Sequence, residues 1–404
     1  MGLRANLPQF VLFSVLTLWI GWFLGMERVV VPVLASDYFH VSSFVLVMSF
    51  IASFGFTKAI LNMFAGKWSD GVGRRPVLIL GWLLGIPVPF ILIFAPDWSW
   101  VVAVNILMGF NQALTWTMTV TSKIDLVGPS NRGLALGINE FAGYVGQASG
   151  GVITGLLAAY YGLRPYPFYF GLAVVLLGLA FSFLLARETK GHAQLEARMN
   201  NNPSDRKSFF GIFATTTWRD RTLFSCSQAG LVEKFTDTLV WALYPLFLVA
   251  ERVSVLDVAM IVGVYQLVLG VSQLFTGVLS DRIGRKPPIV SGMWLMSVGI
   301  LLAARGGSVP YFYLSSVVVG LWMALVYPVL LAVVADVARP EDRGGSLGVY
   351  RFWRDSEYGF GAAAMGIIAD ASGMVSAFYF STLALLLSGF LVLIFMKETL
   401  HRQR

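Results

Sequence analysis

Apolar segments long enough to cross a membrane recur along the whole chain, and this pattern limits the possible folds more than any other feature. A helix of about twenty apolar residues spans the hydrocarbon core of a bilayer. The sequence predicts six such spans in each half. In the first half they lie near 10–34, 42–66, 75–96, 99–122, 133–157 and 165–187. In the second half they lie near 222–250, 255–277, 287–304, 310–336, 345–370 and 375–396.

The composition agrees with a membrane protein and excludes a soluble globular one. Of the 404 residues, 57% are hydrophobic and only 13% are charged, and the mean hydropathy is +0.73. So few polar side chains cannot cover a surface in contact with water. We therefore expect an all-α fold of twelve transmembrane helices. The single cysteine, Cys226, and three widely spaced histidines offer no metal-ligand set, so we expect no metal and no cofactor.

The distribution of Lys and Arg predicts the orientation of the chain. With the amino terminus inside, the predicted cytoplasmic segments hold 21 of the 29 cations, Lys123 among them, and the outer loops hold 3. This bias predicts that both termini lie in the cytoplasm of a protein in the cell inner (plasma) membrane. It also accounts for the net charge of +7, so nucleic-acid binding is the poorer explanation.

The second half of the chain repeats the first at an offset of 211 residues. The sequence GKWSDGVGRRP at 66–76 matches GVLSDRIGRKP at 277–287. Two charged residues of the first half recur at the same offset: Asp125 matches Asp336, and Arg132 matches Arg343. Two homologous, pseudo-symmetric six-helix bundles are the simplest cause of such a repeat.

One long polar stretch separates these predicted bundles. It covers residues 188–220 and reads as a cytoplasmic linker with a short surface helix near Phe209–Phe213. The predicted domains are an N-terminal bundle at 1–187, this linker, and a C-terminal bundle at 221–404.

The two repeated segments resemble the loop motif of the major facilitator superfamily, G-x-L-x-D-[RK]-x-G-R-[RK], between helices 2 and 3 and between helices 8 and 9. The second copy matches in full, whereas the first departs from it at Trp68 and Gly71. The resemblance spans essentially the whole chain and implies alternating-access transport. It also implies breakable latches on the cytoplasmic side, although anchoring by the positive-inside rule alone would explain the arginines. The expected gate residues are Gly66, Asp70, Arg74, Asp125, Arg132, Gly277, Asp281, Arg285, Asp336 and Arg343.

Two further family motifs are eroded in this sequence. Where proton-coupled antiporters carry an Arg in helix 4, this chain has Asn105 before Gly109. The antiporter motif of helix 5 appears as Ala142-x3-Gly146-Gln147-x2-Gly150-Gly151, without its proline. Its glycines still allow close helix packing. These departures speak against a drug/proton antiport mechanism.

Ionisable residues within the predicted spans are candidates for the transport site, because charge inside a bilayer is costly. Five cations and six acids fall within the spans. Lys58 has no acid within four residues, and the repeat makes Arg351 the counterpart of Glu140. The expected substrate-binding residues are Arg28, Lys58, Asn62, Trp116, Tyr327, Arg351, Arg354 and Tyr358. The expected proton-coupling acids are Glu140 and Asp355.

The predicted span at 345–370, the eleventh along the chain, carries the densest cluster of these charges. Arg351, Arg354, Asp355 and Tyr358 fall within one helical stripe about 100° wide, so they must face a cavity or the other half. The alternative is that they are structural pairs within the helix, such as Arg354 with Glu357 or Arg351 with Asp355.

These residues predict a secondary transporter of a small organic anion or zwitterion, with protons as the candidate coupling ion. Export of hydrophobic drugs is an alternative, and so is a transporter-like sensor or assembly factor that moves nothing. An enzyme is not expected, because the sequence shows no nucleophile–base pair or phosphate-binding loop. The expected partners are the solute, the lipid bilayer and protons as the candidate coupling ion, but no nucleic acid, and the chain is expected to be a monomer.

Overall fold

The computed structural model describes residues 2–127, 132–192, 208–339 and 342–400, and these residues form helices without a strand. The helices of the first half are α1 (Leu7–Asp37), α2 (Phe44–Val72), α3 (Arg74–Gly85), α4 (Pro87–Phe94), α5 (Trp98–Val127), α6 (Arg132–Tyr161) and α7 (Tyr166–Leu184). Those of the second half are α9 (Phe209–Ala214), η2 (Thr215–Arg219), α10 (Arg221–Thr238), η3 (Leu239–Leu243), α11 (Tyr244–Ala250), α12 (Val255–Ile283), α13 (Lys286–Ala304), α14 (Val309–Val337), α15 (Arg343–Ser372) and α16 (Met374–Phe395).

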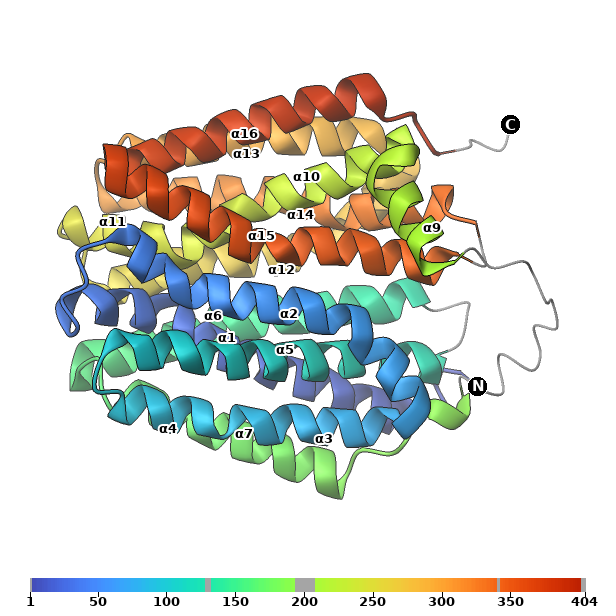
Figure 1. Cartoon of the computed structure of the whole chain (residues 1–404), viewed down its shortest axis with the longest axis horizontal. Helices are drawn as coiled ribbons and strands as arrows, with labels where there is room; N and C mark the ends of the chain where they lie inside the picture. The colour runs from blue at the N-terminus through green and yellow to red at the C-terminus, as the bar shows by residue number, and fades with distance from the viewer. Residues whose placement is uncertain (1, 128–131, 193–207, 340–341, 401–404) are drawn as a thin grey trace.

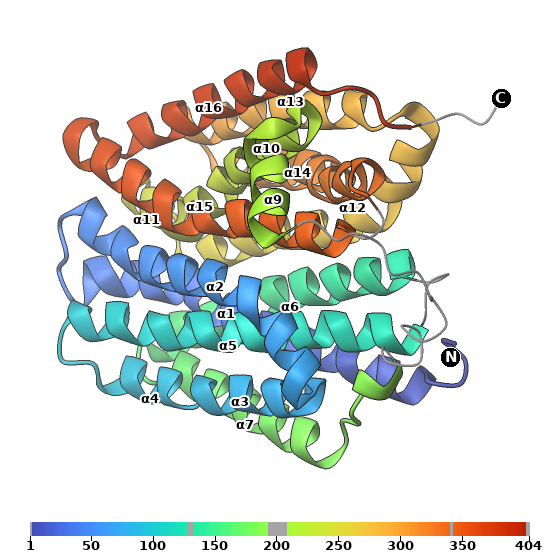
Figure 2. The same cartoon turned by 45° about the vertical axis from the view of Figure 1, so that its right-hand side comes forward.

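The helices form two bundles that lie side by side. In Figures 1 and 2, α1–α7 occupy the lower half of the molecule and α10–α16 the upper half. We call the end at which α1 begins and α16 ends the terminus side. The end at which α2 begins and α15 ends is the far side. The short helix α9 lies at the terminus side, where the linker prediction placed a surface helix.

Two of the twelve spans are interrupted at a proline. Pro87 begins α4 directly after α3, and Pro245 follows the π-helical turn η3. Proline lacks an N–H donor and clashes with the preceding turn, so a helix breaks or changes its hydrogen-bond pattern there. Counting each interrupted run as one span, the fold contains the predicted twelve.

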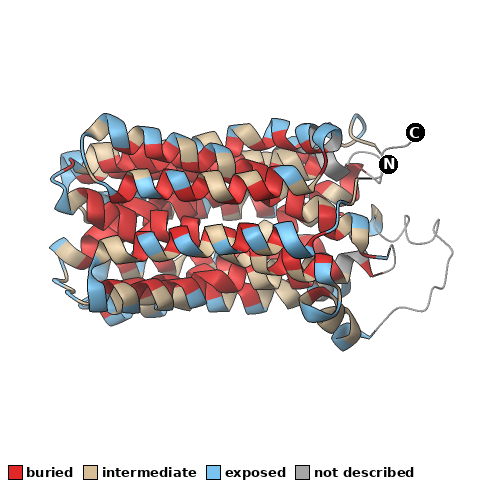
Figure 3. Ribbon diagram, turned by 90° about the horizontal axis from the view of Figure 1, so that it is seen from above, coloured by how far each residue is buried: buried red, intermediate tan, exposed pale blue. Residues whose placement is uncertain are grey.

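Nine spans in the described chain are long and apolar enough to cross a membrane by themselves. The other three are α6, the run from α10 to α11, and α15, which carry charged residues in their interior. Figure 3 shows buried residues on the helix faces that point into the molecule and exposed residues on the outward faces. Large apolar side chains such as Phe94, Phe275 and Ile394 are highly exposed, as expected of a surface in contact with lipid.

The bundles meet mainly through two pairs of helices, α2 with α15 and α6 with α12, and α1 adds smaller contacts with η3, α11 and α12. Gly55 on α2 faces the backbone of Tyr358 on α15, and Gly359 faces the ring of Phe56. A side chain at either glycine would overlap these neighbours, so the small residues permit the close approach.

Asp370 closes the seam between the bundles at the far side. This residue of α15 accepts hydrogen bonds from the Ser43 hydroxyl (2.7 Å) and from the N–H groups of Phe44 (2.5 Å) and Val45 (3.1 Å). Asp370 therefore caps the first turn of α2 from the opposite bundle. An acidic cap satisfies orphan N–H groups and favours the positive end of the helix dipole.

We expect Asp370→Ala to shift the protein towards conformations that are open at the far side. Loss of a cap costs about 1 kcal/mol, which changes a conformational ratio about fivefold. Spin labels on Asp97→Cys and Arg305→Cys, in far-side loops of the two bundles, report the separation. The native Cys226 is buried, so it should not be labelled.

The matched control for this experiment is Asp257→Ala, which removes a capping carboxylate that interacts with Ser254 within a single bundle. It should leave the distance distribution unchanged. An unchanged distance distribution in Asp370→Ala would contradict the role of Asp370 in holding the bundles together at the far side.

Candidate functional site

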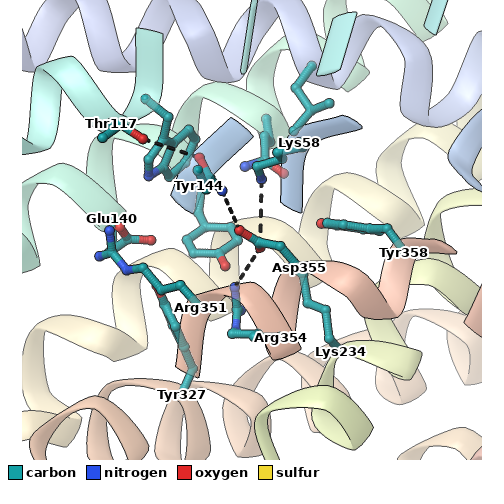
Figure 4. Close-up of a pocket in the computed structure, with 14 residues that line it drawn as sticks. Lys58, Thr117, Glu140, Tyr144, Lys234, Tyr327, Arg351, Arg354, Asp355 and Tyr358 are labelled. Atoms are coloured by element: carbon teal, nitrogen blue, oxygen red, sulfur yellow. Dashed lines mark hydrogen bonds and ion pairs between the residues drawn. The ribbon is translucent and has the colours of Figure 1, made fainter. Parts of the chain in front are cut away.

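A polar cavity lies between the two bundles, and residues of seven helices line it (Figure 4). The lining includes most of the charged residues singled out within the spans. The first bundle contributes Leu24, Lys58, Asn62, Trp116, Thr117, Glu140, Tyr144 and Gln147. The second bundle contributes Lys234, Tyr327, Arg351, Arg354, Asp355 and Tyr358.

Asp355 connects the two bundles inside this cavity. Its carboxylate accepts a hydrogen bond from the Asn62 amide at 2.6 Å and lies 3.9 Å from the Lys58 ammonium. The Arg354 guanidinium lies 4.0 Å away from the same carboxylate. Lys58, which has no acid near it in the sequence, thus finds its counter-ion almost 300 positions along the chain, and Figure 4 shows both side chains pointing at one another.

A second carboxylate, Asp237, forms the most densely bonded polar group of the seam. The Arg28 guanidinium donates two hydrogen bonds to it, both at 2.9 Å, and the Lys234 ammonium donates a third at 2.8 Å. Tyr358 donates from α15. Two residues of α12 complete the set, namely Tyr265 and Gln266, each at 3.2 Å. Arg28, Lys234 and Asp237 are all buried, so each charge depends on these contacts.

Arg354 is held from two directions. Its Nε donates to Glu233 at 2.7 Å, and its guanidinium carbon lies 3.7 Å from the centre of the Tyr327 ring. The expected alternative of pairs within the predicted span at 345–370, which is α15, is therefore wrong in its choice of partners. Arg354 pairs with α10 instead of Glu357, and Asp355 contacts Lys58 across the seam.

Nine of the ten expected substrate-binding and coupling residues line the cavity. The exception is Arg28, whose two terminal nitrogens donate to Asp237 and whose guanidinium carbon lies 4.7 Å from the centre of the Trp241 ring. The sequence interpretation did not select five lining residues: Leu24, Thr117, Tyr144, Gln147 and Lys234. Gln147 lies seven residues after Glu140 and shares its helix face, as the sequence indicates, and Tyr144 follows Glu140 at the same helical spacing, so the 3.6-residue period could have found Tyr144.

The predicted span at 99–122 ends too early, and Lys123 does not lie in the segment that follows it. Helix α5 continues to Val127, and the fully buried Lys123 ammonium donates to the Thr17 hydroxyl at 2.9 Å. The predicted span was ended before Lys123 because this residue is charged. However, the long aliphatic part of a lysine side chain can pack inside a bundle while its ammonium reaches a polar group.

The expected gate residues form one cluster in each bundle at the terminus side. In the first, Arg74 pairs with Asp70 at 2.5 Å and with Asp125 at 3.2 Å. In the second, Arg285 pairs with Asp336 at 3.3 Å. These partners lie within a single bundle. A Cβ atom placed at Gly66 would have no neighbouring atom within 4 Å, so this glycine is not required by close packing. The surroundings of four further gate residues lie outside the described part of the structure: Arg132, Gly277, Asp281 and Arg343.

Each cluster contains a glutamate that the sequence interpretation missed. Glu188 accepts the backbone N–H groups of Arg74 and Arg75, and Glu398 accepts those of Arg285 and Lys286. Partial burial alone would raise the pKa of Glu188 and of Glu398, but these N–H donors outweigh it and lower both. The two glutamates are 210 residues apart, one less than the main offset, and this second repeat was the missed signal.

The geometry around Asp237 predicts unequal effects of two substitutions on stability. Asp237→Asn leaves the buried charges of Arg28 and Lys234 without a carboxylate and should destabilise the fold by about 3–5 kcal/mol. Arg28→Met leaves Asp237 with Lys234 and its neutral donors and should cost less, about 1–3 kcal/mol. Thermal unfolding of the purified protein measures both, with the exposed Glu251→Gln as control. A lower melting temperature for Arg28→Met than for Asp237→Asn would refute this ranking.

Comparisons with known proteins agree with this fold. A family model described as Major Facilitator Superfamily matches residues 11–233 and 229–404. Tetracycline resistance protein, class E, from Escherichia coli is 27% identical over 295 residues, 70% of this chain and 64% of that protein. Multidrug resistance protein 2 from Bacillus subtilis is 26% identical over 162 residues, 40% of each chain. The matched region thus spans less than two thirds of either relative.

Solved structures resemble the whole chain. The inward-open xylose transporter XylE from E. coli has a TM-score of 0.77 at 15% identity, and 97% of each chain is covered. The nucleoside transporter NupG has a TM-score of 0.79 at 13% identity, covering 96% of this chain and 100% of that one. At such identities the likeness establishes the fold only. Because the family model covers both halves and the twelve predicted spans are present, the chain belongs to the Major Facilitator Superfamily.

Proposed function

We propose that this transporter moves a small organic anion or zwitterion by alternating access through the cavity between its bundles. The supporting observation is the charge of the described lining. Four cations, Lys58, Lys234, Arg351 and Arg354, face only two acids, Glu140 and Asp355. Acids and cations are nearly equal in number over all spans, but four of the acids lie outside the cavity lining: Glu27, Glu233, Asp237 and Glu357. Glu233 and Asp237 balance Arg354 and Lys234 from behind the lining, whereas Lys58 and Arg351 keep cationic donors at the cavity surface, where they attract an anionic group.

Lys58 and Arg351 are the two cations best placed to bind the solute. Lys58 lies 3.9 Å from Asp355, beyond hydrogen-bond distance, so its ammonium can donate to a ligand. The Arg351 guanidinium has no hydrogen bond or ion pair to another residue in the described part of the chain, and it lies in the cavity near Glu140 (Figure 4). Arg354 and Lys234 are committed to Glu233 and Asp237, so we assign them to positioning.

The aromatic lining is suited to the apolar part of such a solute. Trp116, Tyr144, Tyr327 and Tyr358 supply ring faces around the charged groups. Lys58 itself lies 5.9 Å from the centre of the Trp116 ring and 5.6 Å from that of Tyr358. Aromatic rings can pack against a carbon skeleton while the cations bind its carboxylate.

We assign proton coupling, if present, to Glu140 in preference to Asp355. Asp355 already has Asn62, Lys58 and Arg354 around it, so its charge is balanced inside the protein. Glu140 has a single long hydrogen bond from the neighbouring Asn139 amide, at 3.4 Å, and is open to the cavity. A carboxylate in this position can exchange its proton when a solute binds or leaves.

We also infer that the terminus side faces the cytoplasm of the cell in the inner membrane, because most Lys and Arg residues lie at this side. The described ends of the predicted linker, 188–192 and 208–220, then lie on the cytoplasmic side together with the gate clusters.

Export of hydrophobic drugs is the second candidate. Two relatives are named for drug or tetracycline resistance, and the aromatic lining would suit such compounds. This function predicts transport of hydrophobic cations, which the positive lining disfavours. Uptake by proteoliposomes of lactate, L-alanine, xylose and ethidium compares an anion, a zwitterion, a neutral sugar and a cation. Transport of ethidium alone would overturn the anion proposal.

We expect Lys58→Met to reduce transport of the anion or zwitterion by about tenfold to a hundredfold. A hydrogen bond to a charged group contributes about 1.5–3 kcal/mol, and each 1.4 kcal/mol is a factor of ten. Initial uptake rates of purified variants in proteoliposomes measure the effect. Lys397→Met removes an exposed lysine outside the cavity and should transport normally. Normal transport by Lys58→Met would remove Lys58 from the binding site.

We expect Glu140→Gln to abolish the response of uptake to an imposed pH gradient while exchange of solute across the membrane continues. The amide keeps the size of the side chain but cannot bind and release a proton as a carboxylate does. Asp355→Asn tests the other expected acid. Glu27→Gln tests a fully buried carboxyl whose oxygens have no hydrogen-bond partner among the described residues. Loss of the pH response in either of these, with Glu140→Gln unaffected, would reassign the coupling acid.

A further inference from the structure

A groove on the first bundle, away from the transport cavity, remains unexplained by transport. It lies at the terminus side, between the first turns of α1 and the end of α7, with the start of α3 beside it. Its walls are apolar: Val11, Leu12, Val15, Phe181, Leu184 and Leu185. In Figure 1, α3 and α7 lie at the edge of the molecule opposite to the second bundle. The groove therefore opens towards the surrounding bilayer.

The walls of the groove stay exposed in the folded chain. Leu184 is 73% exposed, and Val11 and Leu185 are each 50% exposed. In a membrane protein such a surface is covered by lipid chains, because lipid is the apolar solvent available to it. A groove that is apolar along its length and charged at its end is a different feature from a flat lipid-facing helix.

Two arginines stand at the polar end of the groove. Arg75 donates to the Phe183 carbonyl at 2.5 Å, yet its Nε is buried and has no hydrogen-bond partner in the described structure. The Arg187 side chain is exposed, and the described residues offer it no hydrogen bond or ion pair. Arginine presents a planar set of donors that matches the oxygens of a phosphate.

The position of this end is fixed by Gln9. Its amide donates to the Leu185 carbonyl at 3.0 Å, and its carbonyl oxygen accepts the Arg187 N–H at 2.9 Å. This pair of bonds attaches the beginning of α1 to the backbone that follows α7. The apolar walls from α1 and α7 and the backbone of Arg187 are consequently held together.

The only acid of the lining, Glu188, is already satisfied. Its carboxylate accepts the backbone N–H groups of Arg74, Arg75, Thr189 and Lys190 at 2.8–3.0 Å. It has no need of an external amine, so an ethanolamine or choline head group gains nothing from it. Two arginines against this one acid leave one positive charge, which matches a phosphodiester.

We propose that this groove binds one anionic phospholipid, with its phosphate on Arg75 and Arg187 and an acyl chain along α1 and α7. Because Arg75 follows Arg74 in the gate cluster and shares Glu188 with it, the lipid would contact the cluster directly. Basic pockets at the membrane surface are known to recognise anionic head groups in this way.

Native mass spectrometry of the purified full-length protein tests the proposal. The lipids are phosphatidylglycerol, phosphatidylethanolamine and phosphatidylcholine with identical acyl chains. We expect one phosphatidylglycerol to remain bound with at least tenfold preference over the other two. The double variant Arg75→Gln/Arg187→Gln should lose this preference. Arg219→Gln/Arg282→Gln, which removes two exposed terminus-side arginines from the second half of the chain, should keep it.

A second variant keeps both arginines and protects the test against misfolding. Val15→Trp should fill the apolar wall and expel the lipid while thermal unfolding stays close to that of the native chain. Equal binding of all three lipids, or undiminished phosphatidylglycerol binding in both groove variants, would overturn the proposal. Displacement of the lipid by soluble glycerol 3-phosphate would also overturn it, because a head-group site alone would then be sufficient. None of these measurements depends on transport.

Discussion

The buried carboxylate of Asp237 is the interaction on which the seam between the bundles depends. A charge removed from water is tolerated only when donors surround it, and Asp237 obtains them from four helices of both halves. Arg28 comes from the first bundle, whereas Lys234, Tyr265 and Tyr358 come from the second. Lys234 and Tyr358 also line the cavity, so the same network that joins the bundles fixes part of the solute site. A movement that separates the bundles must therefore exchange or break these contacts.

Neighbouring polar groups divide into those that hold the structure and those that remain available. Arg354 is bound to Glu233 and stacked on Tyr327, and Asp355 is surrounded by donors, so both are supports. Lys58 and Arg351 keep donors that face the cavity. This difference gives the site its positive character, although acids and cations are nearly balanced over all spans. At the far side, the cap of α2 by Asp370 adds a second polar contact between the bundles, near the surface.

The sequence predicted the fold well because lipid imposes a simple rule on length and hydrophobicity. The twelve spans and the two-bundle repeat were visible in apolar runs and a constant offset, and Gly73 and Gly284 of the repeated motif adopt positive φ values of 107° and 104°. The ion pairs were not predictable in the same way. Lys58 and Asp355, or Arg28 and Asp237, are far apart in the chain, and no local rule selects one partner among several. Lys123 was misplaced because a charge near the end of an apolar run resembles a loop.

The most direct test of a positively charged solute site is to locate a bound anion. Anomalous diffraction from crystals containing 3-bromopropionate would show the position of the bromine, and the electron density would show its carboxylate. We predict a carboxylate between Lys58 and Arg351, with the brominated carbon against the aromatic lining. A carboxylate bound elsewhere, with the cavity free of the anion at saturating concentration, would contradict the account.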